Sequence, residues 1–193
     1  LASLGAKVLQ TRSVEMAMNH RVRVQVRSTF SEAEGTLVVD ADEIVEQEVV
    51  SGIAYSRDEA KITLVKVADK PGIAASIFSP LADANINVDM IVQNVSEDGK
   101  STDMTFTVPR GEFQRALQVI EKNKAQIAYQ ELLSTSDVTT VSIIGVGMRS
   151  HVGVARQLFE TLDEQGINIK VISTPGIKRS LLTTQEYTDV QVY

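Results

Sequence analysis

Cysteine and tryptophan are absent from this chain of 193 residues, and histidine occurs only twice. Without cysteine there is neither a disulfide nor a thiolate that could bind a metal or attack a substrate. With so few histidines as well, we expect no bound metal. Aromatic residues make up only 5% of the chain. The hydrophobic core must therefore be built mainly from valine, isoleucine, leucine and alanine.

Excess positive charge and long apolar runs are also lacking. Lysine and arginine number 19 against 25 aspartate and glutamate residues, a net charge of -6, and no basic stripe compensates for this. A nucleic-acid partner is therefore not expected. No stretch reaches the roughly 18 uncharged apolar residues of a membrane-spanning helix, and Lys7, Arg12 and Glu15 stand where a signal peptide needs an apolar core. We expect a cytoplasmic protein without a membrane partner.

What the sequence does contain is an internal repeat between Lys61 and Thr174. When Gly72 is aligned with Gly153, the two copies match without a gap. The matched pairs are Phe78 with Phe159, Leu81 with Leu162, Ile86 with Ile167, Asn87 with Asn168 and Ile91 with Ile172. This pattern predicts a duplicated fold that could hold a small molecule between its two copies.

The first copy predicts a complete βαββαβ unit. Its expected elements are a strand at 62–67, a helix with an apolar stripe from Ile73 to Ala84, strands at 85–95 and 103–108, an amphipathic helix at 113–124 and a strand at 127–133. This order is the ferredoxin-like arrangement, which belongs to the α+β class.

The second copy is incomplete. Its expected elements are a strand at 141–146, a helix around Val154, Leu158 and Leu162, and strands at 168–174 and 179–184. Too few residues follow Glu186 for another helix and strand, so we expect the run 49–55 to lend a strand. The predicted domains are 1–40, a helix and two strands outside the repeat; 41–60, an acidic linker with the lent strand; 61–134, the first copy; and 135–193, the second.

The chemistry is expected at the strand-to-helix turns. In the first copy Asp69 can cap the helix, Pro71 pre-sets a helical φ, and Gly72 lets a ligand approach the backbone. Unpaired amides at a helix N-terminus suit the carboxylate of a free amino acid. In the second copy Ser150 replaces Asp69 as the cap. A second interpretation stays open, because aspartate, proline and glycine also dominate turns for purely structural reasons.

Amide side chains accompany both turns. Asn87 and Asn168 occupy equivalent positions, and Gln93 shares a strand face with Asn87 by the two-residue period. Such amides can pair with the ammonium or hydroxyl group of a ligand, or they can simply satisfy a loop backbone. No serine–histidine–aspartate set, phosphate-binding loop or pair of catalytic carboxylates stands out. The chain therefore does not look catalytic by itself.

Six linked motifs occur in order along the chain, namely ASLGAKVLQTRSVE, VADKPGIA, NINVDMIVQN, TDMTFTVPR, GVGMRSHVGVA and GINIKVIST. Over essentially its whole length the sequence thereby resembles the C-terminal half of bacterial aspartate kinase. The resemblance implies that 1–40 is the end of an α/β amino-acid kinase domain. It also implies that the remainder is a tandem pair of ACT domains.

The resemblance carries expectations about activity and partners. The family phosphorylates the side-chain carboxylate of aspartate with ATP and Mg²⁺, and its ACT domains mediate feedback inhibition by lysine, threonine or both. Free amino-acid effectors, a homodimer formed through ACT domains and a catalytic kinase domain or subunit are therefore implied as partners. Most of the catalytic domain is missing here, so we expect this chain to be inactive alone, with no catalytic residue and no cofactor.

Effector contacts of the family can be placed on matching residues of this sequence. For threonine the resemblance implies Asp69, Pro71, Gly72, Ile73, Ala74, Asn87, Val88, Gln93, Val154, Ala155, Asn168 and Ile169. For lysine it implies a second set, Ser96, Thr105, Ser150 and Thr174. The sequence departs from the family pattern at Pro175 and Gly176, which replace a serine and a glutamate in a region used for an effector, and this change bears on lysine recognition.

Two other functions fit the pattern. The chain could be an amino-acid-binding ACT subunit of another biosynthetic enzyme, such as one of branched-chain synthesis, because this unit is widely reused. The kinase-like first 40 residues argue against that hypothesis. The chain could also be a structural dimer without a ligand, in which case the turn residues are purely architectural.

Overall fold

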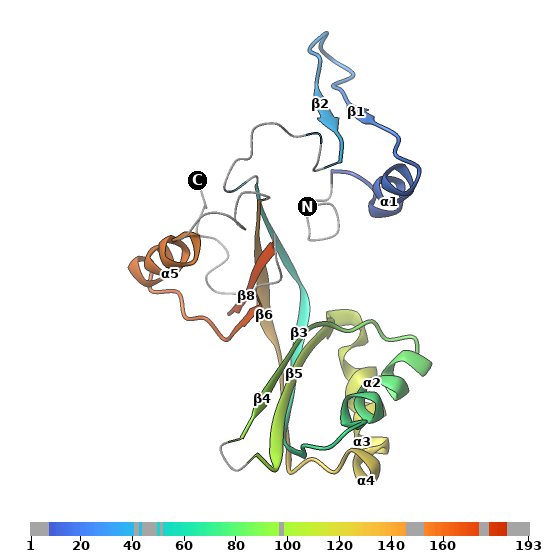
Figure 1. Ribbon diagram of the computed structural model, residues 1–193, viewed down its shortest axis with the longest axis vertical. Helices are drawn as coiled ribbons and strands as arrows, with labels where there is room; N and C mark the ends of the chain where they lie inside the picture. Colours follow the sequence, from blue (N-terminus) through green and yellow to red (C-terminus); the bar gives the residue numbers. More distant parts are fainter. Residues whose placement is uncertain are drawn as a thin grey trace. The chain divides into compact units, whose positions relative to one another are not determined.

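The computed structural model describes residues 8–40, 43, 50, 52–96, 99–145, 153–173 and 178–184. The chain divides into two compact units. The first comprises Leu1–Tyr55, Val141–Gly166 and Thr174–Ser180, and the second comprises Ser56–Thr140, Ile167–Ser173 and Leu181–Tyr193. Each unit is treated by itself below, and Figure 1 shows the elements of both.

The N-terminal segment forms the helix and two strands that the sequence predicts. Helix α1 spans Thr11–Asn19, and strands β1 (Val24–Val26) and β2 (Thr36–Val38) form an antiparallel hairpin. Gly35 has a φ of 79°, and a Cβ there would lie 2.1 Å from the carbonyl oxygen of Val26. The hairpin therefore requires glycine at this position, both for its backbone conformation and for its close approach.

None of the described residues 8–40 of this segment is buried. No residue of α1 is buried. Several apolar side chains are exposed instead, namely Val8, Met16, Met18, Val22, Phe30 and Leu37. So much exposed apolar surface on one short helix and one hairpin is unusual for an independent folding unit.

A six-stranded sheet has the order β4-β5-β3-β6-β8-β7. Its strands are β3 (Gly52–Ala68), β4 (Asp89–Val95), β5 (Ser101–Pro109), β6 (Glu131–Ile144), β7 (Val171–Ser173) and β8 (Lys178–Thr183). The predicted runs 49–55 and 62–67 prove to share one continuous strand, β3, from Gly52 onwards, and the runs 127–133 and 141–146 share β6 between Glu131 and Ile144. Neither connection contains glycine or proline, so nothing in the sequence interrupts the extended chain.

The first copy of the repeat has the predicted βαββαβ order. Helices α2 (Ile73–Asp83), α3 (Phe113–Lys122) and α4 (Lys124–Ile127) lie on one face of β3, β4 and β5 (Figure 1). A short 3₁₀ turn, Arg110–Glu112, leads into α3. Alternate residues of β3 and β5 are buried against the stripes of the helices. The core residues include Ala60, Ile62, Leu64, Ile73, Ile77, Leu81, Met104, Phe106, Val108, Ala116 and Ile120.

Element boundaries differ from the sequence prediction where local backbone hydrogen bonds decide them. Strand β4 begins at Asp89 and not at residue 85, because Asn85 has a φ of 56° and ends α2. The Ile86 amide donates to the carbonyl of Leu81 at 2.9 Å, which forms a Schellman cap. The equivalent residue of the second copy, Gly166, has a φ of 66°.

The predicted helix at 113–124 is also wrong in detail. It ends at Lys122, and the separate turn of α4 follows Asn123, whose side-chain amide donates to the Val119 carbonyl at 2.8 Å. Ala128 then adopts a φ of 55°. The last strand of the first copy consequently begins at Glu131 and not at residue 127. Helix α2 continues through Pro80 to Asp83, although Pro80 has no amide to donate to the carbonyl of Ser76.

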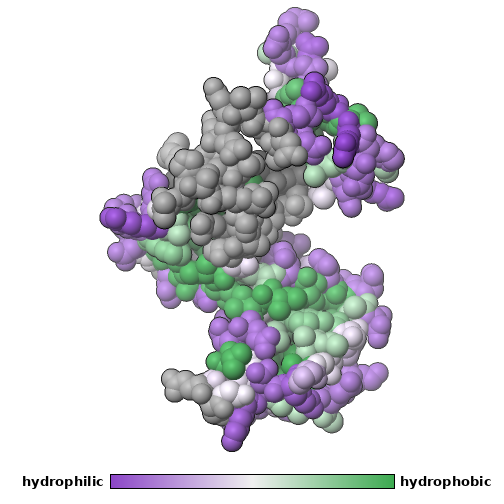
Figure 2. All heavy atoms as spheres, viewed as in Figure 1, coloured by the Kyte–Doolittle hydropathy of each residue, from purple (hydrophilic) through white to green (hydrophobic). Residues whose placement is uncertain are grey.

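The second copy retains helix α5 (Val154–Glu164), β7 and β8. Within the first unit the hydroxyls of Ser142 and Ser180 share a buried hydrogen bond of 2.8 Å. Within the second unit Met90, Val138 and Leu182 form a small buried cluster with Val171 packed against it. Figure 2 shows hydrophobic atoms gathered over the strands of the sheet, whereas the N-terminal hairpin is mainly hydrophilic.

Tyr129 provides a pH-dependent test of the first-copy core. Burial, a 3.2 Å hydrogen bond to Glu121 and the charge of that carboxylate raise the pKa of Tyr129 to about 12. The folded state therefore keeps this proton where the unfolded chain loses it, above the ordinary pKa of 10.0. The stabilisation is complete below pH 10 and is lost as the pH rises towards 12.

We expect ultraviolet titration to show one tyrosine that ionises near pH 12 and that is missing in Tyr129→Phe. The stability of Tyr129→Phe should also fall less than that of the wild type between pH 10.0 and about pH 12. Ionisation of Tyr129 at its ordinary pKa of 10.0 would contradict this arrangement.

Candidate functional site

The turn between β3 and α2 has an unusual backbone. Gly72 is the N-cap of α2 with a φ of 88°, and its carbonyl accepts the amide of Ser76 at 3.0 Å. No side chain caps the helix, so the predicted capping by Asp69 is wrong. Pro71 precedes the N-cap and therefore does not occupy the first helical position that the sequence predicted. Only glycine adopts this positive φ at low cost, which explains why position 72 is a glycine.

The N-terminus of α2 is open. Ala74 and Ala75 are exposed, and their amides have no hydrogen-bond partner among the described residues. A Cβ placed on Gly72 would meet nothing within 4 Å. Unpaired amides and the helix dipole together give this end of an 11-residue helix a partial positive charge facing free space. This arrangement can bind a carboxylate.

The turn is tied to the β4–β5 hairpin. The exposed residue Asp69 donates its amide to the Lys100 carbonyl at 3.0 Å. One residue further along the hairpin, the amide of Ser96 donates to the Ser101 carbonyl at 2.8 Å, and the Ser101 hydroxyl donates to the Ser96 hydroxyl at 2.9 Å. Hydrogen bonds to Lys100 and Ser101 therefore hold two predicted segments, the turn and the end of β4, at the same hairpin.

The remaining residues predicted in the first copy differ in their availability. Asn87 and Gln93 are exposed, Val88 is half-buried against the core, and Ile73 is buried, with its amide donating to the Lys70 carbonyl at 3.2 Å. The hydroxyl of Thr105 is engaged with that of Thr63 at 2.9 Å. Among the described residues of this set, the side-chain amides of Asn87 and Gln93 and the backbone amide of Ala74 have no hydrogen-bond partner.

The second copy repeats this backbone. Gly153 is the N-cap of α5 with a φ of 104°, and its carbonyl accepts the amide of Gln157 at 2.9 Å. Val154 and Ala155 are half-buried at the start of this helix, in the first unit. The left-handed glycine before a helix is thus a shared feature of the repeat. Ser150 and Thr174, predicted for lysine, lie outside the described residues.

Asn168 and Ile169 belong to the second unit, as does Gln93. Asn168 is exposed, and its carbonyl accepts the hydroxyl of Thr183 at 2.9 Å. Within this unit β7, which begins at Val171, contacts β4. Met90 and Val171, which are equivalent in the repeat, meet there in one cluster. The structure therefore brings the second strands of the two copies together.

Sequence reasoning missed a half-buried lysine beside these strands. Lys61 lies opposite Thr107 in the β3–β5 register. Burial and the nearby charge of Lys170 lower the pKa of the Lys61 ammonium. Lysine is common on strands that face solvent, so the sequence gave no indication that Lys61 is half-buried near the charge of Lys170.

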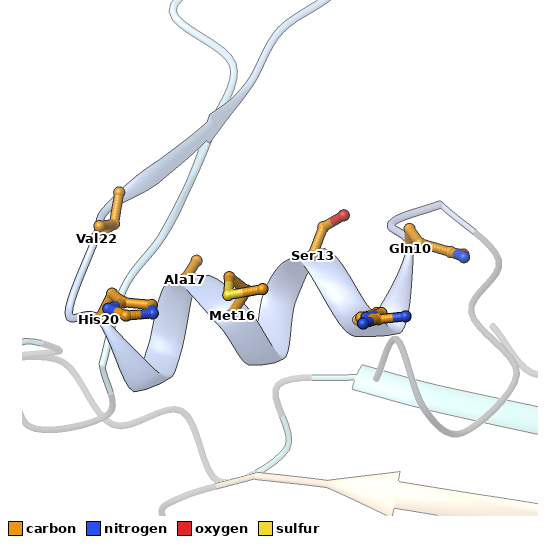
Figure 3. Close-up of a pocket in the computed structure, with 7 residues that line it drawn as sticks. Gln10, Ser13, Met16, Ala17, His20 and Val22 are labelled. Atoms are coloured by element: carbon orange, nitrogen blue, oxygen red, sulfur yellow. The ribbon is translucent and has the colours of Figure 1, made fainter.

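A separate groove of about 610 Å³ lies along α1, and none of the predicted residues lines it. Figure 3 shows its side chains, which include Met16, Ala17 and Val22 among polar neighbours. Among the residues that the structure describes, no group of histidine, aspartate and glutamate side chains could hold a metal ion. In the same part of the chain, no helix is long and apolar enough to cross a membrane.

Two segments of the chain, 61–125 and 141–190, match the family model of the ACT domain. These matches fall on the two copies of the repeat. The chain is therefore a tandem ACT-domain protein, and its ACT domains have the ferredoxin-like α+β fold.

Relatives define the family more closely. The chain is 48% identical over 193 residues to the aspartate kinase of Pseudomonas putida, covering 100% of this chain and 47% of that protein. It is 45% identical to a solved chain of aspartokinase alpha and beta subunits, with a TM-score of 0.67 and coverage of 73% and 92%. It is 37% identical to the ligand-free regulatory subunit of Thermus thermophilus aspartate kinase, with a TM-score of 0.68. That match covers 74% of this chain and 93% of the subunit. The chain belongs to the aspartate kinase family and forms its ACT regulatory region, but it spans about half the length of the curated relative, 47%.

Proposed function

We propose that this chain senses end-product amino acids for an aspartate kinase, with threonine bound at the turn that precedes α2. The open N-terminus of α2 carries this proposal. The exposed amides of Ala74 and Ala75 lack partners among the described residues, and a Cβ on Gly72 would meet nothing within 4 Å. A free amino acid always has a carboxylate, which these amides and the helix dipole attract.

The polar groups around this turn fit the rest of threonine. The exposed carboxylate of Asp69 attracts an ammonium group. The exposed side-chain amide of Gln93, near the end of β4, can pair with an ammonium or a hydroxyl group, whereas the β4–β5 register places Asn87 beyond the opposite end of β4. Asn168, which follows the equivalent helix of the second copy, belongs to the same unit.

The lysine set has less support from the described residues. The hydroxyls of Ser96 and Thr105 already bond to those of Ser101 and Thr63. Pro175 and Gly176 offer neither a hydroxyl nor a carboxylate to a lysine side chain. We therefore propose lysine only as a second effector, whose influence is expected through its effect on threonine binding.

Feedback control follows from a two-state equilibrium. An effector that binds the inactive arrangement of the ACT pair more tightly than the active one shifts the population by its difference in affinity. A tenfold shift requires only about 1.4 kcal/mol. A few hydrogen bonds to the turn are enough to supply that difference.

The partners follow from the same proposal. The exposed apolar residues of α1 and its groove, including Met16 and Val22, suit packing against a catalytic kinase domain that would bind aspartate, ATP and Mg²⁺. The end strand β4 exposes Ile91 and Val95, which suits an ACT-mediated homodimer. We place this enzyme in the cytoplasm.

Isothermal titration calorimetry tests the proposal. We expect saturable binding of threonine to the chain, loss of this binding in Gln93→Ala, and a change of threonine affinity when lysine is present. Absence of heat and of any thermal shift with both amino acids would contradict it. That result would favour the ligand-free structural dimer. Binding of a branched-chain amino acid alone would favour the regulatory subunit of another enzyme.

A further inference from the structure

Two β-bulges interrupt the sheet of the first copy, and one of them borders the proposed effector site. The register between β3 and β5 shifts between Leu64 and Val67, directly before the turn at Asp69. The register between β4 and β5 shifts between Asp89 and Val92, near the opposite end of β5 from the pair of Ala68 with Ser101. Bulges re-aim the chain that leaves a strand and are frequent beside functional sites.

Each bulge contains a non-glycine residue in the left-handed region. Lys66 has a φ of 52° and Met90 a φ of 47°. Side chains with a Cβ are disfavoured in this conformation, so surrounding groups must hold it in place. In both bulges an aspartate does so, because Asp103 Oδ1 accepts the amide of Lys66 and Asp89 Oδ1 accepts the amide of Met90, each at 2.8 Å.

The two aspartates differ in what they connect. Asp89 accepts the amide of the next residue in its own strand, whereas Asp103 reaches from β5 across to β3. On the other side of the same bulge, the amide of Gln130 donates to the Val65 carbonyl at 2.9 Å. The bulge at Lys66 is therefore held from both of its neighbours, and Asp103 supplies the one side-chain contact described there.

The bulge sets the direction in which the chain enters the turn. Beyond it Ala68 pairs with Ser101, and the amide of Asp69 donates to the Lys100 carbonyl at 3.0 Å. Without the extra residue of the bulge, the side chains of Val67 to Asp69 would point to the opposite faces of the sheet. The position of Asp69 and of the open N-terminus of α2 thus depends on the conformation of Lys66.

We infer that Asp103 is a positioning residue for the effector site, acting through the left-handed conformation of Lys66. This inference rests on the proposed function for its effector, threonine, but the hydrogen bond itself is independent of any ligand. Asp103 does not touch the bound amino acid. Its carboxylate holds the bulge that presents the turn.

Threonine titrations of the full chain test the inference with four variants. Asp103→Ala should raise the dissociation constant roughly tenfold, because the turn is no longer held in its binding position before the ligand arrives. Asp103→Asn, which keeps the acceptor oxygen, should stay within about threefold. Lys66→Gly added to Asp103→Ala should restore the affinity to within about threefold, because glycine adopts a positive φ without support. Asp58→Ala removes an exposed carboxylate elsewhere on β3 and should change nothing.

Hydrogen exchange of the ligand-free chain provides the readout that separates positioning from general stability. In Asp103→Ala the amides of Lys66 and Asp69 should exchange faster, whereas those of α3 should not change. Unchanged exchange at both amides would overturn the inference. So would threonine binding that is equal in the wild type and Asp103→Ala, or weakened binding that Lys66→Gly fails to restore. If the wild type does not bind threonine, the proposed function fails, and the exchange of these two amides still decides the role of Asp103.

Discussion

Replacing Phe106 by alanine is expected to lower the free energy of unfolding of the second unit by about 3–5 kcal/mol. Phe106 is fully buried in β5 and lies in the core of the first copy. Its ring meets that of Phe78 edge to face, with 5.3 Å between the centroids. The substitution removes this pair and leaves a cavity between the sheet and α2, which a close-packed core cannot fill.

Urea unfolding, followed by circular dichroism, measures this change. Phe30→Ala is the matched control, because that ring is 97% exposed and its loss should alter stability by less than about 0.5 kcal/mol. Equal effects of the two substitutions would contradict the core described for the first copy. A large effect of Phe30→Ala alone would show that the N-terminal segment determines the stability of the chain.

In the full-length enzyme, Gln93→Ala and Asp69→Ala are each expected to raise the threonine concentration needed for half-inhibition by roughly tenfold. Asp69 is exposed in the turn before α2 and Gln93 is exposed on β4, and in the proposed site both supply polar contacts to the effector. The catalytic domain is a different part of the enzyme. The change is therefore expected in the inhibitor response and not in turnover.

Inhibition curves at fixed aspartate and ATP measure this response. Asn94→Ala is the control, since Asn94 neighbours Gln93 and the structure gives its backbone carbonyl, and not its side chain, a partner in Thr102. It should leave the curve unchanged. A loss of turnover in Gln93→Ala with an unchanged response to threonine would contradict the assignment of the site.

Much of the fold could be predicted from the sequence because the repeat is gapless. The equivalence of Gly72 and Gly153 located both strand-to-helix turns, and both glycines do have a positive φ at the helix N-cap. The stripe of Ile73, Ile77 and Leu81 located the buried face of α2 correctly. Periodicity and glycine placement are local signals, and they were sufficient for these features.

Other features depend on contacts between distant residues. The bulge at Lys66 is held by Asp103 and cannot be inferred from the alternation of ITLVKV, which indicates an uninterrupted strand. The capping role assigned to Asp69 failed because the N-cap of α2 is Gly72, three residues further along the chain, and no side chain caps the helix. Local propensity does not report such long-range hydrogen bonds.

The central claim is that an amino-acid carboxylate binds at the open N-terminus of α2. A titration of the ¹⁵N-labelled chain with threonine, followed by nuclear magnetic resonance, tests it most directly. We predict saturable shifts of the backbone amides of Gly72, Ala74 and Ala75 and of the side-chain amide of Gln93, while the amides of α3 remain in place. Saturable shifts confined to other parts of the chain, such as the groove along α1, would contradict the claim.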